Sequence, residues 1–402
     1  MIKIIISIFS ILIVISCRMP SDPIGEINII NRLDTIRTVG DCLDLAFDAT
    51  DSILIAAANY NGVIAYNVAS KNNIIANITE LVHIDPQEMN PSVANNRAQS
   101  ILISDNNNSA FILDKEDHIW LFKYNEDIFS LKSYLSDEDN CFEARSLSLT
   151  ISDEGSSIGL FTLIKHYSGG SQWVADSRSI VYSEISEEEL SLNDNFDVSC
   201  KIMLNQGNTA DKIFYSNSEN LLSLGLGELG FRIFRLAVAE ETTCIVTNMI
   251  TGDQSITAIE DSESYHCVTS LNGVAVDSGG FIPKVIGSFD TNGEVETFFS
   301  NNNTIFVGLS YSNGFIQYRV NSDDSISKQE YAKGYSVNSI HKDNDILAIA
   351  VGHDGVLLYK SNFDDIQFLG KIETAYANTA KVSGNTIFIG TEDGIEVIQI
   401  KL

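Results

Sequence analysis

The sequence predicts an all-β fold built from a repeated four-stranded unit, and three observations carry that prediction. Apolar runs meet tight polar turns and resume as more amphipathic runs, as in residues 346–359 and 386–397. Asn-Gly or Asp-Gly often forms these turns and supplies the positive φ that tight hairpins require. Five turn glycines recur at intervals of 43, 41, 41 and 39 residues: Gly230, Gly273, Gly314, Gly355 and Gly394. A period near 40 with about four short strands per unit is typical of a β-propeller.

The seventh unit shows the pattern most clearly. Its four strands are expected at residues 336–342, 345–352, 355–360 and 366–373. The second strand is apolar on both sides, which indicates that neighbouring sheets cover both of its faces. Small residues such as Ala350 recur in the second strands and fit crowding near a ring axis. The third strands alternate more, as in residues 314–320.

The two ends of the chain are expected to share the last sheet. The eighth unit supplies three strands, at residues 377–382, 386–390 and 394–400, and no fourth. The segment 25–38 is strand-like, has no unit of its own and resembles the fourth strand of the seventh unit. We therefore expect eight four-stranded blades closed by the N-terminal strand, which leaves no open edge in the last blade. Seven blades is the alternative, because the third unit is long and irregular.

Residues 1–17 are predicted to be an export signal. Lys3 is followed by an apolar stretch of about a dozen residues, shorter than the roughly 20 needed to span a bilayer. The stretch ends in Val14-Ile15-Ser16-Cys17, which resembles the lipobox of bacterial lipoproteins. The resemblance implies that Cys17 is lipidated. An ordinary signal peptide or a short membrane anchor is the alternative.

Residues 18–23 are then expected to be a tether, and residues 24–402 a single propeller domain. Arg18 follows the lipidation site, where some Gram-negative lipoproteins carry the Asp that holds them at the inner membrane. The lipobox resemblance therefore implies the bacterial cell envelope, with the outer membrane or cell surface favoured over the inner membrane.

A second resemblance lies in the third strands. Residues 273–278, Gly-Val-Ala-Val-Asp-Ser, resemble the LVIVD repeats of bacterial and archaeal cell-surface proteins, as do residues 62–68 and 355–359. The likeness extends loosely over residues 37–402, although only the first copy keeps the aspartate after the aliphatic run. It implies a surface propeller and supplies no catalytic residues.

The formal net charge of −29 argues against nucleic acid and anionic lipid headgroups as partners. A lipid anchor would therefore have to hold the protein at a membrane, and we expect a monomer.

Five cysteines follow Cys17, an odd number that leaves at least one thiol free in an exported protein. Their pairing stays open, with Cys141–Cys200 and Cys244–Cys267 as two possibilities.

The sequence offers no motif for catalysis, a cofactor or a metal in the context that such chemistry needs. The six histidines have no recognised metal-ligand spacing. Residues 225–230 match a dinucleotide fingerprint, but a strand-like segment follows where a helix is required. We therefore expect a binding or scaffolding module for an envelope protein or carbohydrate.

Three long insertions, at residues 79–97, 135–143 and 166–179, are expected on one face of the ring, and a fourth, 186–197, on the other. Irregular loops on a regular scaffold commonly carry function. The expected ligand-binding residues lie on the first and third of these insertions: His83, Arg97, His166, Tyr167 and Trp173.

The alternative function is a propeller hydrolase or lyase with its site at the axial mouth. The starts of the first strands would there bring together four polar side chains, those of Asp44, Arg145, Asp211 and Asn338.

Overall fold

The computed structural model covers the strands, one short helix and part of the connections. It describes residues 30–36, 40–71, 74–89, 97–104, 109–114, 119–125, 128–133, 142–143, 150–154, 157–166, 177–186, 200–204, 212–216, 221–225, 231–239, 242–250, 256–262, 265–270, 273–278, 285–301, 303–362 and 365–401. Within these residues no helix is long and apolar enough to cross a membrane. The predicted signal, Cys17 and the tether 18–23 lie outside them.

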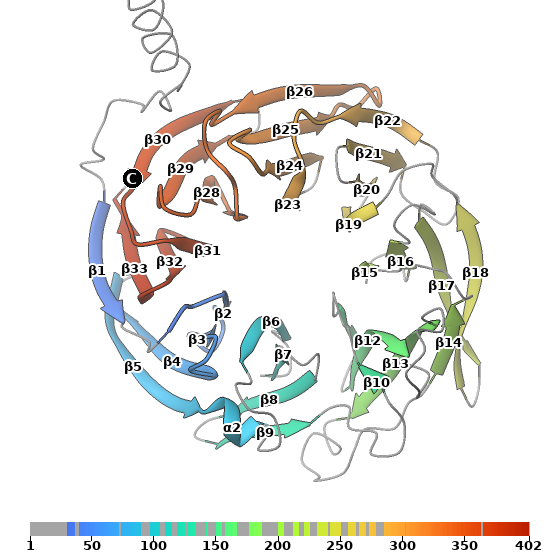
Figure 1. Cartoon of the computed structure of the whole chain (residues 1–402), viewed down its shortest axis with the longest axis horizontal. Coiled ribbons are helices and arrows are strands. Elements are labelled where there is room, and N and C mark those ends of the chain that lie inside the picture. The colour runs from blue at the N-terminus through green and yellow to red at the C-terminus, as the bar shows by residue number, and fades with distance from the viewer. Residues whose placement is uncertain are drawn as a thin grey trace, which may run out of the picture.

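The described strands form eight antiparallel sheets, arranged around a common axis in Figure 1. Sheet 1 contains β2 (Asp44–Asp48), β3 (Ile53–Ala57), β4 (Val63–Lys71) and β5 (Ile74–Ile84). Sheet 2 contains β6 (Ala98–Ser104), β7 (Ser109–Asp114), β8 (Ile119–Asn125) and β9 (Ile128–Ser133). Sheet 3 contains β10 (Phe142–Glu143), β11 (Thr150–Glu154), β12 (Ser157–His166), β13 (Ser177–Ser186) and β14 (Cys200–Leu204). Sheet 4 contains β15 (Lys212–Ser216), β16 (Leu221–Gly225), β17 (Phe231–Ala239) and β18 (Thr242–Ile250).

The second half of the chain continues the same arrangement. Sheet 5 contains β19 (Ile256–Ser262), β20 (Tyr265–Ser270), β21 (Gly273–Ser278) and β22 (Val285–Asp290). Sheet 6 contains β23 (Val295–Asn301), β24 (Thr304–Leu309), β25 (Phe315–Val320) and β26 (Ile326–Tyr331). Sheet 7 contains β27 (Ser339–Asp343), β28 (Ile346–Ala350), β29 (Val356–Ser361) and β30 (Ile366–Ile372). Sheet 8 contains β31 (Ala377–Ser383), β32 (Thr386–Thr391), β33 (Gly394–Ile400) and, from the start of the chain, β1 (Ile30–Ile36).

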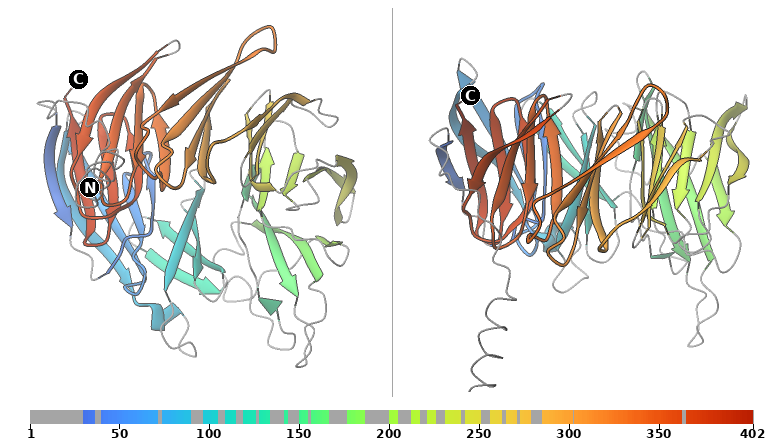
Figure 2. Two further views of the ribbon diagram at one scale, coloured as in Figure 1. Left: turned by 45° about the horizontal axis from the view of Figure 1, so that its top comes forward. Right: turned by 90° about the horizontal axis from the view of Figure 1, so that it is seen from above.

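The innermost strands touch one another in cyclic order. The contacts run β2–β6–β11–β15–β19–β23–β27–β31, and β31 contacts β2 again. Figure 2 shows the strands standing roughly along the axis of this arrangement, so that neighbouring sheets face each other. Every strand residue of β28 is buried, because sheets on both sides cover it. This is the reason why the second strands are apolar throughout.

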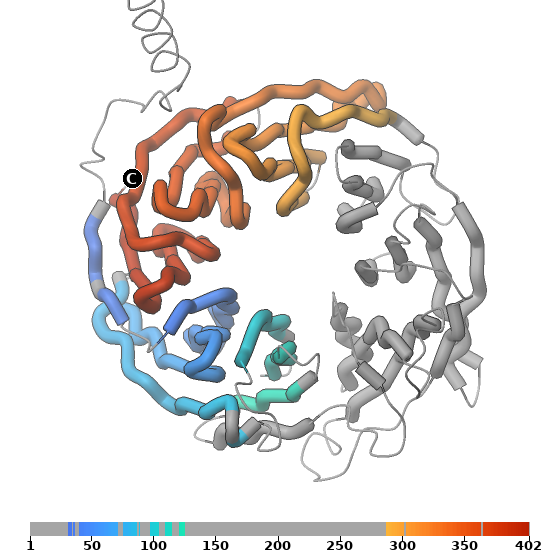
Figure 3. Tube along the Cα trace, viewed as in Figure 1, coloured from blue at the N-terminus to red at the C-terminus, as the bar shows by residue number. Residues whose placement is uncertain are grey.

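The first and last parts of the chain meet in sheet 8, where β1 pairs antiparallel with β33. Figure 3 shows sheets 1 and 8 side by side. Arg32 of β1 places Nη2 3.0 Å from Oε2 of Glu396 and donates a 2.6 Å hydrogen bond to the Glu373 carbonyl of sheet 7. Burial raises the pKa of Glu396, and the charge of Arg32 opposes that rise. The ion pair therefore ties β1 to a carboxylate that would otherwise be desolvated without compensation.

Neighbouring innermost strands are also joined by bonds from the backbone of one strand to side chains of the next. Between sheets 7 and 8, the backbone N–H groups of Ala380, Val382 and Gly384 donate to Ser339 Oγ (3.1 Å), His341 Nδ1 (3.1 Å) and Asp343 Oδ2 (2.7 Å). The acceptors alternate along β27, so each lies on the side that faces sheet 8. The three bonds fix the register between the two sheets.

His341 makes this junction sensitive to pH. Burial, with a smaller effect of Lys381, lowers its pKa to about 4, and Asp343 acts in the opposite direction. An unfolded histidine titrates near 6.5. The native state therefore favours the neutral ring, whose Nδ1 accepts the Val382 bond. The resulting stability is complete above pH 6.5 and is lost as the pH falls toward 4, by about 3 kcal/mol in total.

We expect the substitution His341→Asn to remove this part of the pH dependence, because an amide oxygen can accept the Val382 bond without titrating. Urea unfolding of both proteins at pH 7.0, 5.5 and 4.5 measures the effect. The difference between wild type and variant should shift in favour of the variant as the pH falls. His353→Asn, which changes an exposed ring at the same sheet, is the control. An unchanged difference across the three pH values would show that His341 does not titrate as described.

The structure corrects the expected bounds of the long insertions. Residues 79–84 belong to β5, and their pairing with β4 continues as far as Val63↔Ile84. Two register shifts in that pair, between Ala65 and Tyr66 and between Ala69 and Ser70, interrupt the regular alternation on which the prediction relied. Phe142 and Glu143 form β10, and residues 177–179 belong to β13. The helix α2 (Pro86–Met89) occupies part of the first connection.

Residues 225–230 match the dinucleotide fingerprint, but a strand follows them and not a helix, as the sequence predicted. β16 and β17, on either side of residues 226–230, pair antiparallel from Gly225↔Phe231 onward. Cys42 is a free, buried thiol that packs between sheets 1 and 8. The sulfur atoms of the other cysteines lie outside the described side chains, so the pairing that was left open stays open.

Candidate functional site

The sheets have two edges that carry different connections. The loop face is formed by the turns between second and third strands and by the links between sheets, such as residues 58–62 and 85–89. The turn face is formed by the other connections, such as residues 49–52 and 384–385. A candidate site lies on each face.

On the loop face, two of the predicted binding residues surround one hairpin turn. His83, on β5, places Nε2 2.8 Å from the carbonyl oxygen of Asn61. Arg97, which precedes β6, places its guanidinium carbon 4.9 Å from the centre of the Tyr60 ring. Tyr60 is 56% exposed. The turn therefore presents an aromatic ring, a guanidinium and an imidazole at the junction of sheets 1 and 2.

This turn is held in place from below. Asn59 has a φ of 50° and accepts a 3.1 Å bond from the Ala98 N–H of sheet 2. Its side-chain Nδ2 donates to Asp41 Oδ2 at 3.2 Å. Gly62 closes the turn with a φ of 74°. The Tyr60 ring consequently stands on a backbone that is fixed to two sheets, as a preorganised binding residue requires.

Of the other three predicted binding residues, the structure describes only the backbone of His166, so none of their side chains is placed beside the turn. His166 is the last residue of β12, where its backbone pairs with Phe142 and Ser177. Its side chain, Tyr167 and Trp173 lie outside the described part. Sequence reasoning missed Tyr60. The Asn61-Gly62 pair that follows it indicates a hairpin turn, but not a binding residue.

Two of the four polar residues proposed for the axial mouth, Asp44 and Asn338, are described, and their side chains bond to backbone groups and not to each other. Asp44 accepts from the backbone N–H of Leu45 (2.9 Å) and of Ile101 in sheet 2 (3.0 Å). Asn338 donates to the Ala377 carbonyl of sheet 8 at 2.9 Å. Both side chains serve contacts between sheets. Arg145 and Asp211 lie outside the described residues. Among the described side chains, no group of three or more could hold a metal ion.

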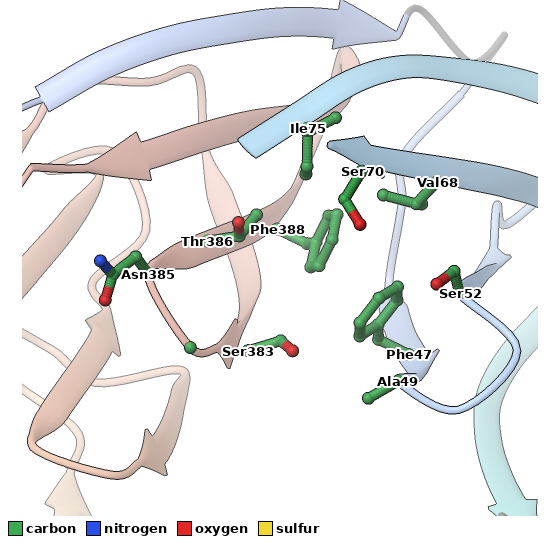
Figure 4. A pocket seen from close by; sticks show the side chains of 11 residues that line it. Phe47, Ala49, Ser52, Val68, Ser70, Ile75, Ser383, Asn385, Thr386 and Phe388 are labelled. Carbon is green, nitrogen blue, oxygen red and sulfur yellow. The ribbon is translucent and has the colours of Figure 1, made fainter. Parts of the chain in front are cut away.

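On the turn face, a cleft of about 420 Å³ lies between sheets 1 and 8. Figure 4 shows the rings of Phe47 and Phe388 at its centre, with hydroxyl side chains from both sheets around them and the Asn385 amide of sheet 8 farther out, at the rim. The described residues that line it are Phe47, Ala49, Ser52, Val68, Ser70, Ile75, Ser383, Gly384, Asn385, Thr386 and Phe388. No sequence pattern indicated it, because its walls come from opposite ends of the chain.

A smaller aromatic depression of about 280 Å³ lies near the loop face between sheets 6 and 7. Phe315 stacks on Tyr331 with ring centres 5.1 Å apart, and Tyr359 meets Phe368 edge-on at the same separation. Lys333 and Glu330 form an ion pair at its rim (2.7 Å).

Comparison with known proteins bears on the fold. No family model matches the chain, and no curated protein matches it. A computationally designed protein, Ika8, has 10% identity and a TM-score of 0.58, over 90% of this chain and 98% of that one. Sqt1 of Saccharomyces cerevisiae has 10% identity and a TM-score of 0.63, over 92% and 99%. A chain of the mitotic checkpoint complex has 10% identity and a TM-score of 0.50, over 96% and 95%.

These similarities, together with the arrangement of the sheets, identify an all-β, β-propeller-like fold. The identities are too low to transfer a ligand or a partner. Propeller-like folds are typical of binding and scaffolding modules, and the same scaffold hosts many unrelated functions.

Proposed function

We propose that this chain is an eight-bladed propeller, closed by β1, which acts as a lipid-anchored binding module at the bacterial cell envelope. The cyclic contacts of the innermost strands and the pairing of β1 with β33 support the ring. The resemblance of residues 273–278 to LVIVD repeats supports a place among cell-surface propellers. We expect a monomer, because the pairing of β1 with β33 completes sheet 8 within one chain.

The anchor rests on the lipobox-like sequence that ends at Cys17. β1 begins at Ile30, opposite Ile400 and therefore on the turn face. A lipid attached upstream of β1 would hold the turn face toward the membrane and leave the loop face open to partners. The strong negative charge does not attract anionic headgroups, so the lipid carries the attachment.

We expect the substitution Cys17→Ser to abolish labelling by a radioactive fatty acid and to release the protein from the membrane fraction. Autoradiography of the purified protein measures the labelling, and cell fractionation followed by immunoblotting measures the release. Cys42→Ser, which alters a buried thiol, is the control. Retention of the Cys17→Ser protein in the membrane fraction would contradict lipid anchoring.

Binding is assigned to the loop face, where an envelope protein or an envelope carbohydrate would be the partner. The observation that carries this assignment is the exposed Tyr60 ring with the Arg97 guanidinium against it, on a turn fixed by Asn59. Tyrosine and arginine are enriched among residues that dominate binding energies. His83, His166, Tyr167 and Trp173 belong to the same proposed surface, and no cofactor, metal or catalytic residue is assigned.

We expect the double substitution Tyr60→Ala/Arg97→Gln to reduce recovery of the partner from envelope extracts by about tenfold or more, equivalent to the loss of one strong contact. Quantitative mass spectrometry of material retained by the wild type and the variant measures it. Tyr311→Ala is the matched control, since Tyr311 is also exposed on the loop face, at sheet 6. A Tyr167→Ala/Trp173→Ala protein tests the third insertion. Equal recovery with wild type and both double variants would remove the case for this surface.

A hydrolase or lyase at the axial mouth is the weaker alternative. Its two described residues, Asp44 and Asn338, are engaged in bonds between sheets, which does not favour a site there.

A further inference from the structure

The cleft between sheets 1 and 8 combines an aromatic centre with polar side chains that have no partner among the described residues. The Phe47 and Phe388 ring centres are 4.8 Å apart at a tilt of 35°. Around them stand the hydroxyl groups of three serines and one threonine, and the Asn385 amide lies at the rim. Within the described part of the chain, none of these five side chains makes a hydrogen bond, although the neighbouring Asp343 and Asp48 do.

Charge is absent from the described lining. Lys, Arg, Asp and Glu make up 20% of the chain, yet none of the lining residues belongs to these types. A charged ligand would enter without a counter-ion, at a large desolvation penalty. A purely apolar ligand would cover five polar side chains and leave their hydrogen bonds unmade. The lining therefore suits an uncharged ligand that offers both C–H surface and hydroxyl groups.

The size and openness of the cleft agree with a small, ring-shaped ligand. A volume of about 420 Å³ falls in the lower part of the roughly 300–1,000 Å³ range of small-molecule sites. Gly384 on its rim would have no heavy atom within 4 Å of an added Cβ, so the wall is open at that point. The backbone around the cleft is fixed, because Asn385 accepts a 2.8 Å bond from the Ile400 N–H and Ser52 accepts one of the same length from Val68.

We infer that this cleft binds a neutral saccharide unit. The apolar face of the sugar ring packs against Phe47, where an aromatic ring offers a flat surface to C–H groups. The sugar hydroxyls bond to Ser52 and Ser70 on sheet 1 and to Ser383, Asn385 and Thr386 on sheet 8. Because the site lies on the turn face, it is separate from the loop-face surface proposed above, and either assignment can fail without the other.

Saturation-transfer difference NMR tests the inference with methyl α-D-glucoside, methyl β-D-galactoside and methyl α-D-mannoside as probes. Glucuronate is the charged counterpart. We expect at least one neutral hexoside to bind and glucuronate not to bind. Absence of transfer to all three neutral hexosides, or equal transfer to glucuronate, would overturn the assignment.

Two variants locate the site. Ser383→Ala/Asn385→Ala removes two hydrogen-bonding groups and should weaken binding about tenfold. Ser70→Trp fills the cleft from an exposed position and should abolish binding. Tyr311→Ala, which removes an exposed ring elsewhere, should leave it unchanged, and thermal unfolding checks that every variant is folded. Wild-type transfer in both cleft variants would overturn the assignment. Cosedimentation with insoluble, cross-linked dextran distinguishes a polysaccharide ligand from a free sugar. If the cleft binds a polysaccharide, the dextran should carry down the wild type but not Ser70→Trp.

Discussion

Deletion of residues 24–38 from a form of the protein that begins at residue 18 is expected to lower the midpoint of thermal unfolding by about 10 °C and to cause aggregation. The deletion exposes the whole edge of β33, which pairs with β1 along its length. It also removes Arg32 and leaves Glu396, with only 9% of its side chain exposed, without its counter-ion. Ile36, which packs against the core shared by sheets 1 and 8, is lost as well.

The matched control is a deletion of residues 24–29, which removes chain without touching β1. Differential scanning calorimetry and size-exclusion chromatography compare the two proteins. The shorter deletion should unfold like the parent and elute as a monomer. If the longer deletion did the same, β1 would not be needed for the stability of sheet 8.

Gly355→Ala is expected to destabilise the fold by about 3 kcal/mol or more. Gly355 has a φ of 79°, which side chains rarely adopt, and an added Cβ would lie 2.1 Å from the carbonyl oxygen of Ile372. That oxygen belongs to the fourth strand of the same sheet and cannot move without breaking the pairing of β29 with β30. Strain in the turn and displacement of a strand therefore add.

Gly384→Ala separates the two contributions. Gly384 also has a positive φ, 55°, but nothing lies within 4 Å of its added Cβ. Only backbone strain remains there, and the expected loss is about 1–2 kcal/mol. Urea unfolding of both variants measures the difference. Equal losses of unfolding free energy in the two variants would mean that the Ile372 carbonyl moves away at little cost. The hairpin glycines would then be required only for their positive φ.

The close approach of a carbonyl explains why the spacing of glycines predicted the fold. The same contact recurs at Gly62, 2.0 Å from the Ile84 oxygen, and at Gly314, 2.1 Å from the Tyr331 oxygen. A repeated backbone contact demands a repeated residue, so the period is visible in the sequence. Burial made the strands of the seventh and eighth units predictable to within a few residues. β28 and β32 are buried along their whole length, so their sequences are apolar throughout.

The candidate sites were harder to predict because they form between units. The cleft needs Phe47 and Phe388, which are 341 positions apart and meet only when sheets 1 and 8 pack together. His83 and Arg97 were predicted from the length of their insertion, but their common neighbour, the turn at Tyr60, has the local sequence of any hairpin. Periodicity reports what each unit repeats, and these contacts do not repeat.

The most direct test of the account is a disulfide between β1 and β33. Asn31 and Gln399 are opposite partners in the pairing of these strands, at a separation that a disulfide can span. In the form beginning at residue 18, Asn31→Cys/Gln399→Cys should form an intramolecular bond on mild oxidation, detected by mass spectrometry of the digested monomer, and should unfold at a higher temperature than its reduced form. Asn31→Cys with Val397→Cys, out of register by two residues, should link far less. A bond that forms only between molecules, or equally well in both pairs, would contradict closure of the ring by the N-terminal strand.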